Sequence, residues 1–207
     1  MLAIIDYGMG NLFSVEKALR ASGVEPIITS DAKVIQAADK IVLPGVGAFG
    51  DCMKNLEQSG LIPEIKQFIA SGKPFLGICL GLQLLFDSSE ESPGVAGLGI
   101  FAGTVKKISA QGYKIPHMGW NSLVYHKDNF LFRGLNQSPY VYFVHSFQAV
   151  PDDASLISAY TDYGGEITAA VTKDNVQAVQ FHPEKSSQVG MQILRNFVQS
   201  GQGRQSV

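Results

Sequence analysis

The sequence predicts an α/β fold in one domain, with a central, mostly parallel sheet, helices on both of its faces and a smaller antiparallel sheet region. Short apolar segments alternate with helical periodicity through the first half of the chain, which is the pattern of βα units. The second half has shorter strand-like segments. With 207 residues, 45% of them hydrophobic, the chain can bury one sizeable core.

The first half contains four expected strands, at residues 2–6, 26–29, 40–44 and 74–78. They are continuous apolar runs, which suit strands that are buried on both faces. Apolar residues at helical spacing predict a helix that begins after Asn11, as its N-cap, and stops at Gly23. A second helix is expected between the third and fourth strands, over residues 61–70.

The second half predicts a mixed or antiparallel sheet. Its strand-like segments are residues 101–109, 121–125, 140–144, 156–160, 169–172 and 176–180. Met191, Leu194 and Val198 recur at helical spacing near the end. We expect one domain over residues 1–200, followed by a polar and disordered tail, residues 201–207.

Charge and composition exclude several classes of protein. The 16 basic and 18 acidic residues give a net charge of −2 without blocks of like charge, which argues against nucleic acid or a membrane surface as a partner. The N-terminal apolar run ends at Asp6, too early for a signal peptide or a membrane span. Two cysteines are too few for a disulfide framework. We expect a cytoplasmic protein.

The stretch GICLG, residues 77–81, places Cys79 between two glycines, after an expected strand and before a helical pattern. This is the form of a nucleophile elbow with Cys in place of Ser. Glycines leave room for the tight reversal, and a helix N-terminus beside the sulfur favours the reactive thiolate. The alternative interpretation is a small residue of the core, since free cysteine is commonly buried.

A thiol nucleophile needs a base, and the base needs a partner that orients its ring. His182 follows the expected strand 176–180, and Glu184 comes two residues later. In an extended chain, residues two apart point to the same side, so the carboxylate could reach the far ring nitrogen. A histidine at a strand end is more often structural, but together with the elbow it predicts a Cys79–His182–Glu184 triad.

Acyl chemistry also needs hydrogen-bond donors for the developing oxyanion. The backbone N–H of Leu80 follows the nucleophile directly. A second donor could come from LPGVGAFGD, residues 43–51, whose glycines allow close approach to a substrate. The alternative is an ordinary glycine loop.

No cofactor or metal is expected. The stretch LPGVGAFGD lacks the Lys-Ser/Thr ending of a P-loop. In GMGNLF, Phe13 stands where a dinucleotide fingerprint has its third glycine. The four histidines, His117, His126, His145 and His182, form no close ligand cluster with the cysteines.

With these motifs, the chain resembles class I (triad) glutamine amidotransferases over nearly its whole length. The elbow with Gln83 behind it and the later His-Pro-Glu identify the class. Within the class, the chain is most similar to the glutaminase subunits of imidazole glycerol phosphate synthase, from histidine biosynthesis. The shared segments are IDYGMGN, LPGVGAFGD, GICLGLQLLF, PHMGWN, YFVHS and QFHPEKSS.

The resemblance implies that Cys79 attacks the side-chain amide of glutamine. His182 would then protonate the departing ammonia, Glu184 would orient His182, and water would hydrolyse the thioester to glutamate. The oxyanion would be held by Leu80 and by Val46 or Gly47.

The resemblance also implies which residues hold glutamine and which partner uses the ammonia. Glutamine would be held by Gly47, Gln83 and the backbone of His145, Ser146 and Phe147. The partner would be a separate (β/α)₈ cyclase subunit, which makes imidazole glycerol phosphate and an aminoimidazole carboxamide ribonucleotide. Four residues in family-like segments are expected to border this cyclase: Asn11, Trp120, Tyr142 and Lys185. Alternatively they are ordinary surface or core residues.

Two departures from many class I relatives stand out. The oxyanion loop has Gly45-Val46-Gly47 instead of a Gly-Gly pair, and a residue with a Cβ turns its backbone less freely than glycine. We therefore hypothesise that Val46 keeps glutaminase activity low until the partner and its nucleotide bias the loop. Phe147 replaces an expected Tyr, which should leave backbone contacts intact. Cys52, at the start of an expected helix, fits packing better than chemistry.

Three other functions use the same features. A glutaminase subunit of another amidotransferase would share the triad, but PHMGWN and HPEKSS argue against it. A cysteine hydrolase of peptides or thioesters would use the same thiol and histidine. An inactive interaction module would keep the fold and lose triad members, and here all three are present.

Overall fold

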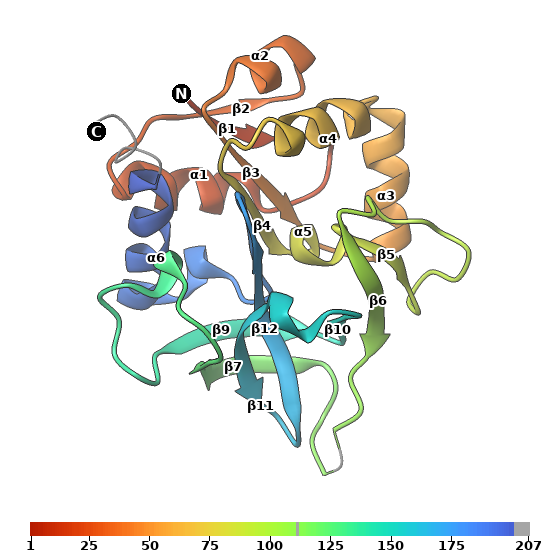
Figure 1. The fold of residues 1–207 in the computed structure, drawn as a ribbon, viewed down its shortest axis with the longest axis vertical. Helices are drawn as coiled ribbons and strands as arrows, with labels where there is room; N and C mark the ends of the chain where they lie inside the picture. Colours follow the sequence, from red (N-terminus) through yellow and green to blue (C-terminus); the bar gives the residue numbers. More distant parts are fainter. Residues whose placement is uncertain (111, 201–207) are drawn as a thin grey trace.

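An eight-stranded sheet runs through the centre of the molecule (Figure 1). The computed structural model describes residues 1–110 and 112–200. The order across the sheet is β2 (Pro26–Thr29), β1 (Leu2–Ile5), β3 (Lys40–Gly45), β4 (Phe75–Cys79), β13 (Val176–Val179), β12 (Glu166–Lys173), β11 (Ile157–Asp162) and β8 (Val124–Tyr125). The strands from β2 to β13 pair in parallel, and the pairs from β13 to β8 are antiparallel.

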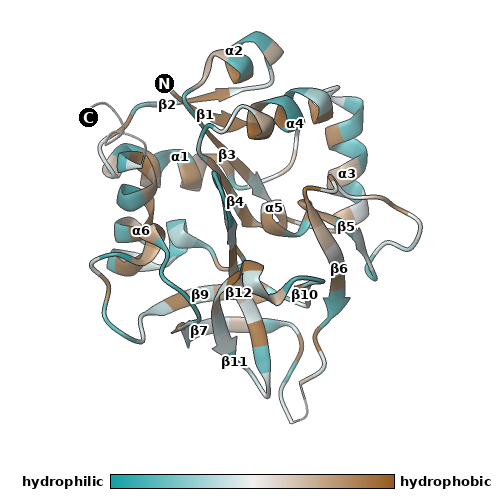
Figure 2. Ribbon diagram, in the orientation of Figure 1, coloured by the Kyte–Doolittle hydropathy of each residue, from teal (hydrophilic) through white to brown (hydrophobic). Residues whose placement is uncertain are grey.

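Helices cover both faces of the parallel part. On one face lie α1 (Leu12–Ala21) and α6 (Ser187–Gln199); on the other lie α2 (Ala32–Ala37), α3 (Phe49–Gln58) and α4 (Ile62–Ala70). The alternation of side chains along a strand divides β1 between the two cores. Leu2 and Ile4 pack with α1 and α6, whereas Ala3 and Ile5 pack with the other helices. Figure 2 shows the hydrophobic residues concentrated in these strands and on the inner sides of the helices.

Two small sheets flank the central one. The first has the order β10 (Phe147–Pro151), β6 (Phe101–Lys107) and β5 (Phe86–Ser89), with an antiparallel and a parallel pair. The second is an antiparallel pair of β7 (His117–Ser122) and β9 (Tyr140–His145). The remaining short elements are α5 (Leu80–Gln83), η1 (Phe130–Phe132), η2 (Ala154–Leu156) and η3 (Pro183–Lys185).

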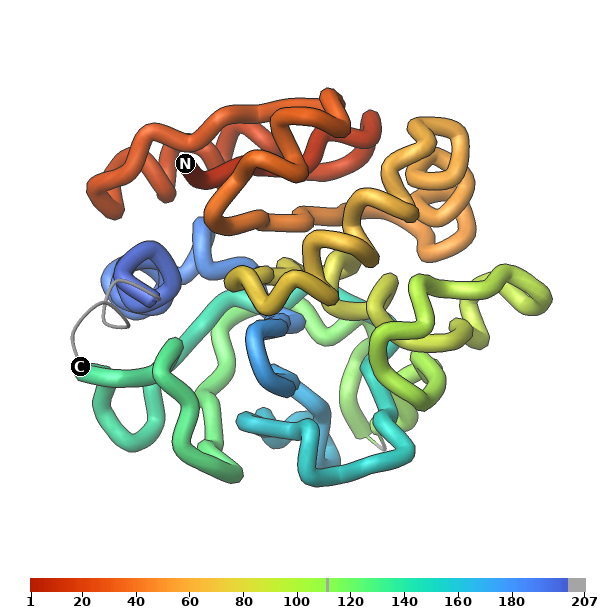
Figure 3. The backbone as a smooth tube through the Cα atoms, turned by 45° about the horizontal axis from the view of Figure 1, so that its top comes forward, coloured from red at the N-terminus to blue at the C-terminus, as the bar shows by residue number. Residues whose placement is uncertain are grey.

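The C-terminal part of the chain joins the two halves of the molecule. Figure 3 shows the first elements on one side, the green and cyan segments on the opposite side, and the blue C-terminal segment between them. The strand order agrees, because β13 lies between β4 and β12. A residue that follows β13 therefore comes close to the end of β4.

The predicted architecture is confirmed, and most predicted strands agree with the structure to within a few residues. The prediction of one strand over residues 121–125 is only partly confirmed: these residues belong to two strands, the end of β7, which begins already at His117, and the short β8. HMGWNS has glycine and asparagine, which are poor strand formers, and it is held in a strand by its pairing with β9. The sequence analysis also missed α2, β5 and β10. The polar tail, residues 201–207, lies outside the described residues.

In residues 1–110 and 112–200, no helix has the length and apolar character needed to span a bilayer.

Candidate active site

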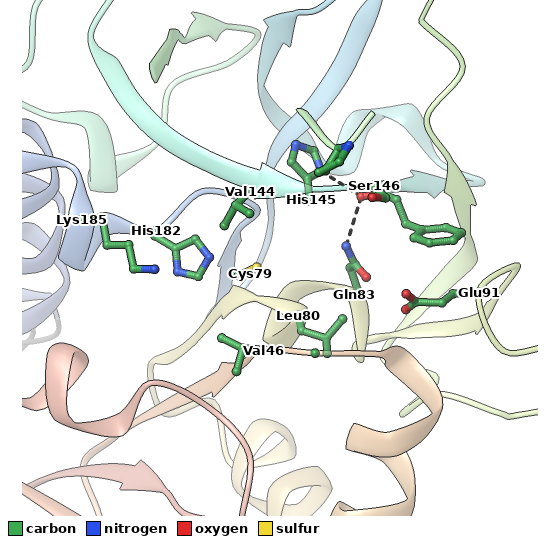
Figure 4. Close-up of a pocket in the computed structure, with 13 residues that line it drawn as sticks. Val46, Cys79, Leu80, Gln83, Glu91, Val144, His145, Ser146, His182 and Lys185 are labelled. Atoms are coloured by element: carbon green, nitrogen blue, oxygen red, sulfur yellow. Dashed lines mark hydrogen bonds between the residues drawn. The ribbon is translucent and has the colours of Figure 1, made fainter. Parts of the chain in front are cut away.

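The carboxyl ends of neighbouring parallel strands meet at one edge of the sheet and border a cavity. β3 ends at Gly45, which pairs with Cys79 at the end of β4, and the chain that leaves β13 reaches His182. The cavity has a volume of about 440 Å³. The residues that line it are Val46, Gly47, Cys79, Leu80, Gln83, Glu91, Pro116, Val144, His145, Ser146, Phe147, His182 and Lys185 (Figure 4).

Cys79 sits at a strained turn between β4 and α5. Its φ of 55° is unusual for a residue with a side chain, and such strain is typical of a nucleophile elbow. The flanking glycines have a steric reason. A Cβ on Gly81 would lie 2.0 Å from the carbonyl oxygen of Leu43, and one on Gly77 would lie 2.8 Å from that of Gly81. The elbow therefore packs backbone against backbone, and this close packing fixes the position of the sulfur.

The helix after the nucleophile is shorter than the sequence pattern indicated. α5 has only four residues, Leu80–Gln83, and the chain enters β5 at Phe86. A single turn has a small dipole, so the predicted stabilisation of the thiolate by the helix is weaker than expected. The N–H of Leu80, in the first turn, has no intrahelical partner and can serve as an oxyanion donor.

His182 and Glu184 form a buried hydrogen-bonded pair. His182 Nδ1 lies 2.7 Å from Glu184 Oε1, and the two side chains are only 3% and 1% exposed. The chain here is a 3-10 turn, η3, and not the extended segment from which the contact was predicted. The turn is held in place by Ser186, whose hydroxyl donates to the His182 carbonyl at 2.6 Å and accepts from the Tyr142 N–H at 2.9 Å.

The surroundings of His182 favour a charged ring. Burial alone would lower its pKa, but hydrogen bonds to Cys79 and Glu184 and the charges of these partners outweigh burial and raise the pKa of His182 to about 10. In Figure 4 the His182 ring lies on one side of Cys79 and Gln83 on the other. Near neutral pH the ring is thus an imidazolium, ready to donate a proton beside the sulfur.

Two side chains anchor the loop after β3 that is predicted to stabilise the oxyanion. The Tyr7 hydroxyl donates to the Pro44 carbonyl at 3.0 Å, and the Cys52 thiol donates to the Val46 carbonyl at 3.4 Å. Burial raises the pKa of Cys52 to about 11, so its thiol keeps the proton that it donates. Because a peptide unit is planar and trans, the N–H of Gly47 points away from Cys52. Cys52 is buried, as predicted, and also contacts this loop.

The predicted glutamine-binding residues line the far side of the cavity. Gln83 Nε2 donates to the Phe147 carbonyl at 3.1 Å, and His145 Nδ1 lies 2.9 Å from the same oxygen. His145 Nε2 is 2.9 Å from His117 Nδ1. Burial lowers the pKa of His117 to about 4 and that of His145 to about 3, so both rings are neutral at physiological pH.

Sequence reasoning missed two polar residues at this site. Glu91 lines the cavity and its Oε2 accepts from the N–H of Phe49, at the start of α3, over 2.8 Å. No motif in the sequence pointed to it. Gln180 is fully buried, and its Nε2 lies 3.8 Å from Cys79 Sγ. Its position two residues before His182 was the available signal. The sequence analysis also missed Pro116 and Val144, two apolar residues that line the cavity.

Three of the four residues that were predicted to border a partner, Trp120, Tyr142 and Lys185, lie together beside the cavity. The Trp120 side chain is 52% exposed, and its ring and the Tyr142 ring form a T-shaped pair with centroids 6.2 Å apart. Lys185 Nζ lies 5.9 Å from the centre of the same ring and lines the cavity. Asn11 occupies the N-cap position of α1, which packs against η3, although its side chain makes no capping hydrogen bond. In the described part of the chain, no group of three or more His, Cys, Asp or Glu side chains could hold a metal ion.

The sequence also matches known proteins. The family model "Glutamine amidotransferase class-I" matches residues 3–200. The chain is 52% identical to proteins named imidazole glycerol phosphate synthase subunit HisH from Aquifex aeolicus, over 94% of each chain, and from Methanothermobacter thermautotrophicus, over 96% of this chain and 98% of the relative. The chain belongs to the HisH family of class-I glutamine amidotransferases.

Solved structures share the fold at low sequence identity. The structure of PurLQS from Thermotoga maritima superposes with a TM-score of 0.74 at 21% identity, covering 95% of this chain and 96% of that chain. A glutamine amidotransferase from the same organism gives a TM-score of 0.67 at 14% identity, with 95% of each chain covered. At these identities the likeness concerns the fold, and the HisH relatives identify the family.

The backbone contact at the elbow leads to a steric prediction. Gly81→Ala should lower the free energy of unfolding by about 3 kcal/mol and remove glutaminase activity, because its Cβ must push the Leu43 carbonyl away. Urea denaturation and ammonia release measure both effects. Gly60→Ala is the control, since nothing lies within 4 Å of its Cβ and only its φ of 70° is unfavourable, at about 1 kcal/mol. Equal effects of the two substitutions would contradict the steric account.

Proposed function

We propose that this chain is a glutaminase that hydrolyses glutamine to glutamate and ammonia through a thioester on Cys79, and supplies the ammonia to a partner subunit. The observation that carries the proposal is the convergence, in one cavity, of a cysteine at a strained elbow with a buried His182–Glu184 pair. Membership of the HisH family supports the choice of glutamine over other amides and esters.

In the first half-reaction, Cys79 Sγ attacks the side-chain amide carbon of glutamine. The oxygen that becomes negative is stabilised by the N–H of Leu80 and by an N–H of the Val46–Gly47 segment. The C–N bond then breaks as His182 gives its proton to the leaving nitrogen. Ammonia departs, and the glutamyl group stays on the sulfur as a thioester.

In the second half-reaction, water replaces ammonia. His182, now neutral, takes a proton from the water as the oxygen attacks the thioester carbon, and the same N–H groups stabilise the second oxyanion. The C–S bond breaks, glutamate is released, and the thiolate and imidazolium are restored. Glu184 keeps the ring oriented and stabilises its charge in both steps.

The cavity offers complementary groups for the main-chain end of glutamine. Both N–H groups of Gln83 are used, by the Phe147 carbonyl and by Gln180 Oε1, which leaves Gln83 Oε1 as an acceptor. Figure 4 shows Gln83 and Glu91 together on the side of the cavity away from His182. We place the α-ammonium of glutamine at these acceptors, with the backbone of Ser146 and Phe147 along the substrate.

The partner in this proposal is a separate (β/α)₈ cyclase that consumes the ammonia in histidine biosynthesis. The relatives are named as subunits of a synthase, which supports an assembly. Trp120 is exposed and lies against Tyr142, and exposed aromatic residues of this kind are enriched at interfaces. Lys185 lies beside the same Tyr142 ring. Gating by Val46 stays a prediction: the cyclase and its nucleotide would bias the oxyanion loop toward its active form.

The proposed function is tested by ammonia release from glutamine, with the purified chain alone and with the matching cyclase and its nucleotide. Activity should rise strongly with the partner and should vanish in Cys79→Ala, which keeps the fold but lacks the nucleophile. Turnover of peptides or thioesters instead of glutamine would show a different cysteine hydrolase. No turnover of any of them would contradict the glutaminase. Full activity without the partner would keep the glutaminase and discard the gating by Val46.

The role of Glu91 has a separate test. Glu91→Gln keeps an oxygen for the Phe49 N–H but removes the charge. The KM for glutamine should rise roughly tenfold with little change in kcat, because the lost interaction binds the substrate and the transition state equally. Steady-state kinetics in the presence of the cyclase measure both constants. Glu90→Gln is the matched control, because this neighbouring carboxylate is exposed and does not line the cavity. An unchanged KM in Glu91→Gln would remove Glu91 from the binding site.

A further inference from the structure

Gln180 is a buried polar side chain for which the reaction described above has no use. It follows β13, where its N–H donates to the Ala169 carbonyl at 2.8 Å, and it is 0% exposed. Its amide nitrogen is 3.8 Å from Cys79 Sγ, within the range of a hydrogen bond to sulfur. A buried amide needs partners for its polar atoms, so the direction in which this one points has an energetic cause.

The orientation of the Gln83 amide follows from a single carbonyl. The Phe147 carbonyl oxygen can only accept, so the atom of Gln83 that lies 3.1 Å from it must be the NH₂ group. The same nitrogen lies 3.0 Å from the Gln180 amide and has a second hydrogen to donate. The atom of Gln180 that faces Gln83 must therefore be its oxygen.

With its oxygen facing Gln83, Gln180 has its NH₂ group facing Cys79. The sulfur therefore receives an N–H donor and not a carbonyl oxygen. An N–H donor favours a sulfur that carries negative charge, because hydrogen bonds to ionised groups are about twice as strong as neutral ones. The reversed amide would place a partially negative oxygen against the sulfur.

The second donor to the Phe147 carbonyl is compatible with this assignment. His145 Nδ1 must carry the hydrogen that this oxygen accepts, so His145 Nε2 is an acceptor in the neutral ring and receives Nδ1–H of His117 at 2.9 Å. His117 Nε2 in turn accepts from the Asn121 amide at 3.3 Å. Every partner along this buried chain is satisfied by one set of orientations, and that set ends with an N–H at the sulfur.

We propose that Gln180 is a hydrogen-bond donor to the Cys79 nucleophile, oriented by Gln83 and the Phe147 carbonyl, which holds the sulfur in place and stabilises it as a thiolate. This role rests on the proposed function of Cys79. It adds to the site a second side chain beside the sulfur, which comes from the end of β13. It also takes over part of the stabilisation that a helix longer than α5 would have supplied. Since α5 is a single turn, the thiolate depends on His182 and Gln180 instead.

The test measures the reactivity of Cys79 directly, without glutamine. Gln180→Met keeps the size of the side chain but has no N–H. Alkylation of Cys79 by iodoacetamide, followed by peptide mass spectrometry, should be about tenfold slower at neutral pH, and its rate profile should move to higher pH. The titratable groups near the sulfur, His182, Tyr7 and Cys52, are unchanged in this variant.

Gln177→Met is the matched control. Gln177 is also buried and lies on β13, but its Oε1 has no hydrogen-bond partner among the described residues. Its replacement should leave the alkylation rate within about twofold. Urea denaturation of both variants separates a general loss of stability from an effect on the sulfur.

The outcomes are distinct. A folded Gln180→Met protein with an unchanged alkylation rate and pH profile would overturn the proposal, as would equal losses in Gln177→Met. If Gln180→Met does not fold, Gln180→Leu decides, since its side chain is shorter than that of glutamine, is apolar and has no N–H to donate. It should slow alkylation about tenfold, and an unchanged rate would overturn the proposal. Failure of the proposed function would appear separately, as fast alkylation of the original chain with no turnover of glutamine.

Discussion

The buried hydrogen bond between His182 and Glu184 is the interaction on which the chemistry of the cavity depends. A carboxylate that is 1% exposed is costly unless a cation balances it, and the ring of His182 is the cation that contacts it. The turn η3, the hydroxyl of Ser186 and the position of β13 beside β4 all serve to bring this pair to the sulfur. Because the pKa of His182 is raised above its ordinary 6.5, the stability gained from its proton is fully present below that pH and is lost as the pH rises through about 10.

Cys79, the proposed nucleophile, is fixed by a different kind of constraint. Gly81 and Gly77 allow backbone to approach backbone, so the strained Cys79 cannot relax without moving β3. The oxyanion loop follows β3 directly and is tied to the same core through Tyr7 and Cys52. Sulfur and loop thus share one rigid support, which is the arrangement that preorganised oxyanion stabilisation requires.

Much of this site was predictable from sequence because its features are local. The elbow, the His182–Glu184 pair and the glycine loop are each a short stretch of sequence. Each follows a strand of the parallel sheet, and the carboxyl ends of those strands meet at one edge. Glu91 could not be predicted, since it reaches the cavity through a contact with the start of α3 that joins segments far apart in the chain. Gln180 was visible in QFHPE, but its role follows only from the orientation of Gln83. β7 was misplaced because its pairing with β9, and not its own composition, makes it a strand.

The most direct test of the central claim is an NMR titration of the ring nitrogens of His182 in histidine-labelled protein, with Cys79→Ala for comparison. The account predicts that the ring stays protonated through pH 7 and titrates near 10, and that it loses its proton at a lower pH when the sulfur is removed. A ring that titrates near 6.5 in both proteins would contradict the account of a protonated His182 beside Cys79.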